Sequence, residues 1–335
     1  MALKWGIVGA GRISQDFVTA VKTLPESDHK VLAVAGRNKE NVQRFAKQLD
    51  IERTYDDYGK LAADNDIDIV YIGNLNTQHF ESAKLMLEHG KHVLCEKPFT
   101  MNEKQTTKLT QIAKERKLFL AEAVWSRSFP AYKKLKELME SGELGDVLFC
   151  SVNFGFPLQH VDRLTSKDFG GGAILDLGVY ILQFQQWVFR GLKPLEVAVS
   201  GHKNGAGTDE SAGVVLTYPE GKMAVVSTSA RVALPNEGLV VGTKGSAKLP
   251  KFWCPTELIT DEKSYEWPLP ESPLPFLHVN SAGLSYEAEE ARQCIKNGLI
   301  ENPSITHQES IELARLMDLV RKQLGVVFPE DSQDF

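Results

Sequence analysis

The feature that most constrains this chain is a regular alternation of short apolar runs and longer helical periods over its first third. Apolar runs of strand length occur at Lys4–Val8, Val31–Ala35, Ile67–Ile72, His92–Cys95 and Leu118–Ala121. Helical stretches between them include Lys39–Leu49, Phe80–His89 and Glu103–Arg116. Strands and helices that alternate in this way form a parallel sheet covered by helices on both faces, with right-handed connections. The pattern predicts an N-terminal α/β domain with a doubly wound, Rossmann-type sheet.

The remainder of the chain has a different pattern. From Leu195 to Trp267 it consists mostly of short strands separated by turn residues. Helices are expected before and after this region, at Lys133–Ser141, Ala173–Phe189, Ser285–Asn297 and Gln308–Leu324. This order predicts an α+β domain with an open, mostly antiparallel sheet and helices on one face. We expect a division near Ala123–Phe129, into domains of residues 1–124 and 125–335.

A glycine-rich turn follows the first strand and leads into the first helix. Gly9 allows the tight turn, Gly11 lets the backbone approach a pyrophosphate, and Ser14 is a small residue where the fingerprint has its third glycine. The helix N-terminus then faces the phosphates. Arg12 and Ile13, the first residues of the helix, are expected to contact the dinucleotide. The alternative is a structural turn without a ligand.

The end of the second strand discriminates between the two pyridine dinucleotides. Enzymes that use NAD place an acidic residue there to hold the ribose 2′-hydroxyl. This chain has Gly36-Arg37-Asn38 instead, and the Arg37 guanidinium can bind a 2′-phosphate. Arg12, Lys39 and Arg44 could add positive charge. The sequence therefore favours NADP, with a solvated loop arginine as the alternative interpretation of Arg37.

Composition excludes several classes of partner. The formal net charge of -6 argues against binding to nucleic acid or to an anionic membrane, since both require a basic surface. No apolar run is long enough for a membrane span, and the N-terminus does not resemble a signal peptide. The cysteines form no CxxC pair and no zinc-ligand spacing. We expect reduced thiols, no metal site and a cytoplasmic location.

A lysine lies at the carboxyl end of the His92–Cys95 strand, in the sequence Glu96-Lys97-Pro98. Ligands bind at this edge of doubly wound sheets. An ammonium group beside a nicotinamide ring could lower the pKa of a neighbouring hydroxyl. From the spacing alone, an ordinary surface lysine is the more common outcome.

Several motifs together resemble one family. They are Gly9-Ala-Gly11, Thr77-Gln-His79, the stretch from Gly90 to Pro98, the stretch from Gly170 to Tyr180, and Gly242-Thr-Lys-Gly245. The chain is similar over essentially its whole length to the glucose–fructose oxidoreductase/inositol dehydrogenase (Gfo/Idh/MocA) family. Four segments resemble in particular those members that use NADP to oxidise dihydrodiols or D-xylose: the N-terminus, Trp253–Leu258, Ser285–Ala288 and Gly325–Pro329.

The resemblance implies roles for individual residues. Lys97 and Tyr180 correspond to the catalytic pair, with Asp176 orienting the substrate or Lys97, one helical turn before Tyr180. A phenolate on Tyr180, stabilised by Lys97, would accept the proton of the substrate hydroxyl. Without the resemblance, the sequence favours a half-buried core aromatic at Tyr180 over a catalytic group. Further cofactor contacts are expected from Asn38, Asn74, Asn76, His79, Glu96 and Lys97, and the substrate pocket from Trp125, Arg127, Phe154, His160, Asp176 and Trp253, with Phe156, Arg163 and Phe276 as additional candidates.

The function implied is hydride transfer between the nicotinamide of NADP and a carbinol carbon of a small sugar or diol. Two alternatives belong to the same family: another sugar or inositol dehydrogenase, and a carbonyl reductase working in the opposite direction. A third is a regulator that binds dinucleotide without catalysis. The resemblance also implies a homodimer that forms through the open sheet of the second domain, with two-fold symmetry.

Overall fold

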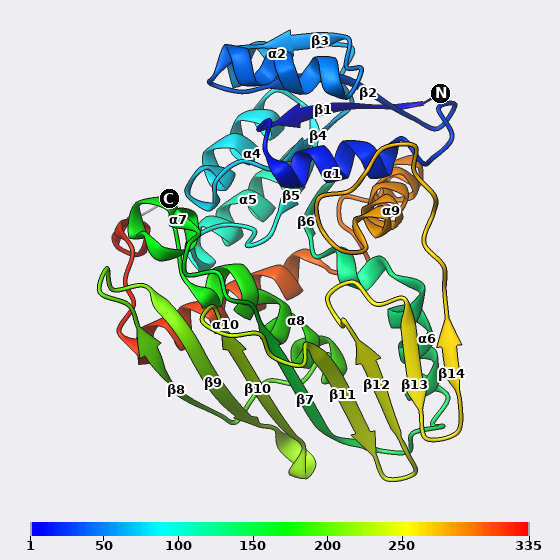
Figure 1. The fold of residues 1–335 in the computed structure, drawn as a ribbon, viewed down its shortest axis with the longest axis vertical. Coiled ribbons are helices and arrows are strands. Elements are labelled where there is room, and N and C mark those ends of the chain that lie inside the picture. The colour runs from blue at the N-terminus through cyan, green and yellow to red at the C-terminus, as the bar shows by residue number, and fades with distance from the viewer. Residues whose placement is uncertain (1, 334–335) are drawn as a thin grey trace.

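Two β-sheets organise the protein, and Figure 1 shows them one above the other with helices against both. The computed structural model describes residues 2–333. Met1, Asp334 and Phe335, which belong to the ends of the two predicted domains, lie outside the described residues. Both predicted sheets are present, so the expected fold class is confirmed.

The first sheet is entirely parallel, with strand order β3-β2-β1-β4-β5-β6. Its strands are β1 Leu3–Val8, β2 His29–Ala35, β3 Arg53–Tyr55, β4 Ile69–Ile72, β5 His92–Glu96 and β6 Leu120–Ala123. Its helices are α1 Arg12–Val21, α2 Lys39–Gln48, α3 Tyr58–Ala62, α4 His79–Glu88 and α5 Glu103–Arg116. The strand order reverses between β1 and β4, and the crevice at such a point is where ligands bind.

Burial explains why these strands read as continuous apolar runs. All four residues of β4 are buried, because helices cover both faces of the sheet. The helices begin at polar caps where the chain provides them: the Asn38 side chain accepts a hydrogen bond from the Asn41 amide at the start of α2, and the Asn102 side chain does the same for Gln105 at the start of α5. The caps satisfy backbone donors that have no partner within the helix.

The second sheet has the order β14-β13-β12-β11-β7-β10-β9-β8 and is antiparallel except for the β7–β10 pair. Its strands are β7 Val147–Gly155, β8 Glu196–Lys203, β9 Asp209–Thr217, β10 Met223–Ser229, β11 Glu237–Gly242, β12 Ser246–Pro250, β13 Glu257–Thr260 and β14 Ser264–Glu266. The helices of this part are α6 Pro130–Glu140, α7 Asp162–Thr165, α8 Val179–Val188, α9 Leu284–Lys296 and α10 His307–Leu324.

Helices α6, α8 and α10 pack against one face of this sheet. The other face carries apolar side chains that stay accessible. Val215 on β9 and Met223 and Val225 on β10 are each 38% exposed, while their neighbours along the strands are buried against the helices. We call this side of the sheet, represented by Val215, Met223 and Val225, the open face.

Several elements differ from the prediction. The sequence did not predict strands β3, β7 and β14 or the short helices α3 and α7. The helix expected at Ala173–Phe189 begins instead with a π-helical turn, Ile174–Gly178, followed by α8. β7 is half-buried, so Ser151 and Asn153 on the open face interrupt its apolar residues and obscure the strand signal. It nevertheless lies at the centre of the second sheet.

The C-terminal helices return to the first sheet. Helix α9 packs on α1, α10 packs on α5, and the Leu120 amide donates to the Ile300 carbonyl. The division into residues 1–124 and 125–335 therefore remains a proposal, because the second part closes around the first. Within residues 2–333, no helix combines the length and the apolar character that a bilayer crossing requires, and no cluster of three or more potential metal ligands occurs.

Candidate active site

The glycine turn after β1 passes close to the loop after β4. Gly9 has a φ angle of 95°, and a Cβ atom there would lie 3.0 Å from the Asn74 amide nitrogen. Only glycine meets both constraints. Gly11 is the N-cap of α1, and no side chain caps this helix. The amides of its first turn are therefore available to a phosphate.

Small residues allow helix α1 to approach the β4 loop. Ser14 is fully buried, and a Cβ atom on Gly73 would lie 2.5 Å from its Oγ atom. The Ser14 Oγ and Asn74 Oδ1 atoms are buried without a hydrogen-bond partner among the described residues. Asn74 is oriented by its amide group, which donates to Ser82 Oγ at 2.8 Å. The turn, the uncapped helix and these polar atoms fit a dinucleotide.

The loop after β2 presents cationic and amide side chains beside this turn. Arg37 is exposed and follows β2 without an acidic neighbour in the Gly36–Asn38 segment. Asn41, on the first turn of α2, donates to the Ala10 carbonyl at 3.0 Å and accepts from Arg44 at 2.6 Å. Asn41 and Arg44 thus support the glycine turn. The sequence alone did not predict this role for Asn41.

Glu96 and Lys97 lie at the carboxyl end of β5. Glu96 is 7% exposed, and its carboxylate accepts hydrogen bonds from the Tyr71 phenol at 2.5 Å and from the Lys97 amide at 3.2 Å. The Lys97–Pro98 peptide bond is cis. These contacts hold the start of the Lys97 side chain at the edge of the first sheet, as the prediction required.

His79 contacts the loop that contains Lys97 and Pro98. Its Nδ1 atom is 2.8 Å from the Pro98 carbonyl, and its Nε2 atom is 3.3 Å from the Asn74 carbonyl. Burial lowers the pKa of His79 to about 4, so the ring is neutral at physiological pH. It connects the Lys97 loop with the Asn74 loop. Asn76 makes a similar connection to the second part of the chain, donating to the Gly170 carbonyl at 3.1 Å.

Lys97 and Asp176 meet across the two parts of the protein. The Lys97 ammonium donates to the Asp176 backbone carbonyl at 2.9 Å and to its carboxylate at 3.2 Å. Arg163 donates to the same carboxylate oxygen at 2.9 Å. Burial alone would raise the pKa of Asp176, but the charges of Lys97 and Arg163 outweigh it and hold that pKa well below its usual range. Asp176 is therefore ionised.

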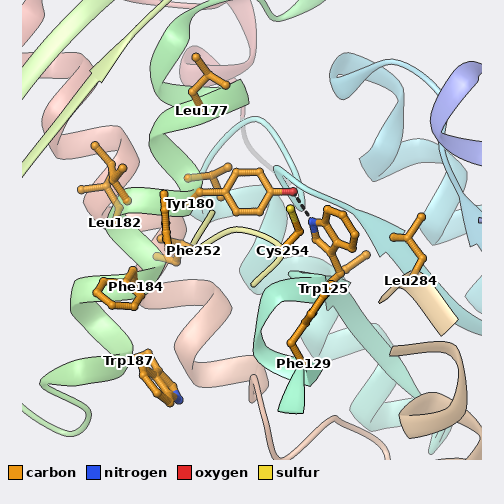
Figure 2. Close-up of a cluster of buried hydrophobic side chains, with 14 of the residues drawn as sticks. Trp125, Phe129, Leu177, Tyr180, Leu182, Phe184, Trp187, Phe252, Cys254 and Leu284 are labelled. Atoms are coloured by element: carbon orange, nitrogen blue, oxygen red, sulfur yellow. Dashed lines mark hydrogen bonds between the residues drawn. The ribbon is translucent and has the colours of Figure 1, made fainter. Parts of the chain in front are cut away.

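Tyr180 lies beside this ion pair. The Lys97 ammonium is 5.1 Å from the centroid of its ring, and Figure 2 shows the Tyr180 hydroxyl pointing toward the Trp125 indole, which donates to it at 2.7 Å. Burial, with a further contribution from the charge of Glu96, raises the pKa of Tyr180 well above its usual value. The phenol is consequently neutral, and its hydroxyl hydrogen has no acceptor among the residues that the structure describes.

The π-helical turn places Asp176 and Tyr180 on one side of the helix. Its first residue is held by Asp209, whose carboxylate accepts the Ile174 amide at 2.6 Å. Gly172 approaches this carboxylate so closely that a Cβ atom would lie 2.5 Å from Oδ1, and its φ angle is 130°. The glycine-rich stretch before Asp176 thus allows Asp209 to fix the helix start.

Aromatic side chains surround Tyr180 on the side of the second sheet. The Phe154 ring centroid is 5.4 Å from that of Tyr180, 4.7 Å from that of Trp253 and 5.3 Å from that of Phe156. The predicted candidates Trp125, Phe154 and Trp253 are therefore brought together. Phe276 is partly buried against the same apolar core.

Two predicted substrate residues are placed differently. Arg127 is 3% exposed, and its guanidinium donates to Glu309 at 2.8 Å, to the Gln183 side chain at 2.8 Å and to two backbone carbonyls. Its donors are occupied by partners within the protein, and a substrate contact by Arg127 remains a prediction. His160 is exposed in the segment that connects β7 to α7, with no hydrogen bond among the described residues.

Comparison with known proteins identifies the family. Residues 3–124 match the model of an oxidoreductase family with an NAD-binding Rossmann fold, and residues 132–248 match the GFO/IDH/MocA C-terminal domain. This chain belongs to the Gfo/Idh/MocA oxidoreductase family. It is 42% identical to a trans-1,2-dihydrobenzene-1,2-diol dehydrogenase of Danio rerio over 99% of this chain and 100% of that protein. The same enzyme of Homo sapiens is 41% identical over 99% and 100%.

Solved structures show the same fold. A 3-ketoreductase from Actinomadura kijaniata, in complex with NADP and TDP-benzene, matches with a TM-score of 0.80 and 24% identity over 96% of this chain and 98% of that one. The predicted family resemblance is thus confirmed, and with it an oxidoreductase that binds a pyridine dinucleotide. The roles of the individual site residues remain predictions.

Proposed function

We propose that this protein is an NADP-dependent oxidoreductase that moves a hydride between the nicotinamide and a carbinol carbon of a trans-dihydrodiol or a D-xylose-like aldose. The proposal rests on one observation: Lys97, Asp176 and Tyr180 lie together at the carboxyl edge of the first sheet, the edge that also carries the glycine turn. The names of the relatives at about 42% identity support the diol as substrate.

The preference for NADP rests on the loop after β2. Arg37 is exposed where an NAD enzyme would place a carboxylate. A guanidinium can bind a 2′-phosphate through two parallel hydrogen bonds. Arg12 is also exposed, at the first position of α1. Gly9, Gly11, Ile13, Asn38, Asn74 and Asn76 are the further residues proposed to hold the dinucleotide.

When bound, the nicotinamide supplies or accepts the hydride. The chain's own residues manage the proton. A neutral Tyr180 phenol can donate its proton to the oxygen of a substrate carbonyl as that oxygen gains charge. In the direction of oxidation the Tyr180 oxygen has to accept a proton, and the Lys97 ammonium over its ring and the Trp125 indole both stabilise the phenolate form.

Charged and aromatic groups around Tyr180 suit a small polyol. Asp176, Lys97 and Arg163 can exchange hydrogen bonds with neighbouring hydroxyls, and their existing ion pairs keep them oriented. Phe154 and Trp253 offer apolar rings to the carbon skeleton. A vicinal diol on a ring of six atoms, or a pyranose, presents both surfaces at once.

The open face of the second sheet is proposed as the contact of a homodimer. Val215, Met223 and Val225 expose apolar surface there, and such surface commonly marks a subunit interface. A two-fold axis would bring the same strands of both copies together. A cytoplasmic location is proposed because all four cysteines are buried and unpaired.

The test is a turnover screen by dinucleotide absorbance. Trans-dihydrodiols, D-xylose, D-glucose and inositol are offered with NADP and with NAD, and carbonyl compounds with the reduced forms. The proposal expects turnover of a dihydrodiol or D-xylose with NADP. Turnover of inositol alone would support a different dehydrogenase, turnover of carbonyls alone a reductase, and dinucleotide binding without turnover of any substrate a regulator.

A further inference from the structure

A buried carboxyl group without a partner lies behind the candidate active site. Glu287, on the first turn of α9, is 3% exposed. Neither of its carboxyl oxygens has a hydrogen-bond partner among the described residues. Helix α9 packs on α1 and on the short 3-10 helix Trp125–Ser128. Leu284, on the same face of α9 one turn earlier, lies on the side of Trp125 away from Tyr180 in Figure 2.

Glu96 is another buried carboxyl of this region, and its surroundings differ from those of Glu287. It accepts the Tyr71 phenol and the Lys97 amide, and both donors stabilise a negative charge. Burying an ionised carboxylate without donors is far more costly than burying a neutral acid. If one of the two groups carries a proton, the hydrogen bonds therefore assign that proton to Glu287.

The groups that face Glu287 support this assignment. Burial first, and then the charges of Glu96 and Glu290, raise the pKa of Glu287 well above its usual range. A negative charge on Glu287 would also raise the pKa of the Tyr71 and Tyr180 phenols. Glu290, on the same helix, is held by Ser128, Lys133 and Asn302. On α1, which packs on α9, the Asp16 carboxylate accepts hydrogen bonds from Leu277, His278 and Ser281 and is itself an anion, so it cannot stabilise a charge on Glu287.

We propose that Glu287 is a positioning residue of the active site. In the folded protein Glu287 keeps its proton, so that Glu96 and not Glu287 carries the negative charge behind Tyr180. The inference rests on the proposed function, in which Tyr180 exchanges a proton with the substrate. Ionisation of Glu287 adds a second negative charge behind the phenol. It makes the Tyr180 proton harder to remove and thereby limits oxidation at high pH.

The first experiment does not depend on catalysis. An acid that is protonated when folded but ionised when unfolded takes up a proton on folding, so its contribution to stability falls as pH rises from its unfolded pKa to its folded pKa. Thermal unfolding of the wild type and Glu287→Gln is followed from pH 4 to pH 9. The wild type is expected to lose melting temperature relative to Glu287→Gln above about pH 4.5.

A matched control lies two residues away. The hydrogen bond from Arg292, the largest influence, together with those from Gln293 and His29, lowers the pKa of Glu289 to about 2. Its carboxylate stabilises the fold above its unfolded pKa, so Glu289→Gln should lose stability relative to the wild type as pH rises, the opposite trend. Infrared spectra at pH 8 should show a protonated carboxylic acid band in the wild type and in Glu289→Gln but not in Glu287→Gln.

The second experiment measures the pH profile of turnover with the substrate found in the screen. Glutamine imitates the neutral acid, so Glu287→Gln should turn over within about threefold of the wild type near pH 7, and its oxidation rate should keep rising at high pH where the wild type levels off. If the amide prevents folding, Glu287→Met replaces it.

Parallel stability curves for the wild type and Glu287→Gln, or a protonated acid band that survives the substitution, would overturn the assignment of the proton even if the enzyme turns over no substrate. A loss of about 100-fold in turnover near pH 7, with the dinucleotide still bound, would show that the ionised carboxylate is required and overturn the positioning role.

Discussion

The indole nitrogen of Trp125 donates a hydrogen bond to the phenol oxygen of Tyr180 over 2.7 Å, and this bond joins the end of the first sheet to helix α8. Only Val124 separates Trp125 from the end of β6, so the position of Trp125 depends on the first sheet. Tyr180 follows the π-helical turn of the second part. The bond occupies one lone pair of the phenol and leaves its hydrogen to point toward a substrate.

Trp125→Phe should therefore lower turnover by about tenfold, since a hydrogen bond to the reacting group contributes about 1.4 kcal/mol. The Michaelis constant for the dinucleotide should change little. Steady-state kinetics with the matched variant Trp187→Phe, which alters a buried tryptophan elsewhere on the α8 side of the core, provides the control. Equal turnover numbers for Trp125→Phe and the wild type would contradict the role given to this bond.

Arg37 should determine the choice of dinucleotide. Arg37→Glu removes the partner of the 2′-phosphate and offers a carboxylate to a 2′-hydroxyl, so the ratio of kcat/KM for NADP over NAD should fall by about 100-fold or more. Initial rates with both dinucleotides measure this ratio. Arg44→Gln, which retains a donor toward Asn41, should change it by much less. An unaltered ratio in Arg37→Glu would show that another residue reads the phosphate.

The sequence predicted more of the fold than of the contacts in the candidate site. Continuous apolar runs such as β4 and the turn Gly9–Gly11 are local signals, and both were interpreted correctly. β7 was missed because half of its residues face the open side of the sheet. The pairing of Arg127 with Glu309 was not predicted, because the two residues lie 182 positions apart in the sequence and a local pattern does not reveal such a pair. The isolation of Glu287 depends likewise on what surrounds it in three dimensions.

Asp176 should stabilise the fold in a pH-dependent manner. Its folded pKa is depressed by Lys97 and Arg163, so its contribution is present above the unfolded value of 3.8 and is lost as pH falls through the folded pKa. Asp176→Asn should cost about 2 kcal/mol near pH 7, a value reduced because Arg163 is half-exposed. Denaturant unfolding at several pH values measures this.

The difference between Asp176→Asn and the wild type should shrink below about pH 4. A difference that stays constant down to pH 2 would mean that the carboxylate charge does not contribute. Turnover should also fall, because the Lys97 ammonium loses the acceptor that fixes its orientation.

The central claim is that Tyr180 exchanges a proton with a substrate held beside the bound dinucleotide. The most direct measurement compares hydride transfer in a single turnover by Tyr180→Phe and the wild type, with dinucleotide affinity determined by fluorescence titration of the same preparations. We expect the affinity to stay within about threefold while the transfer rate falls by at least about 100-fold, because a general acid–base group is lost. A Tyr180→Phe protein that transfers hydride at the wild-type rate would contradict it.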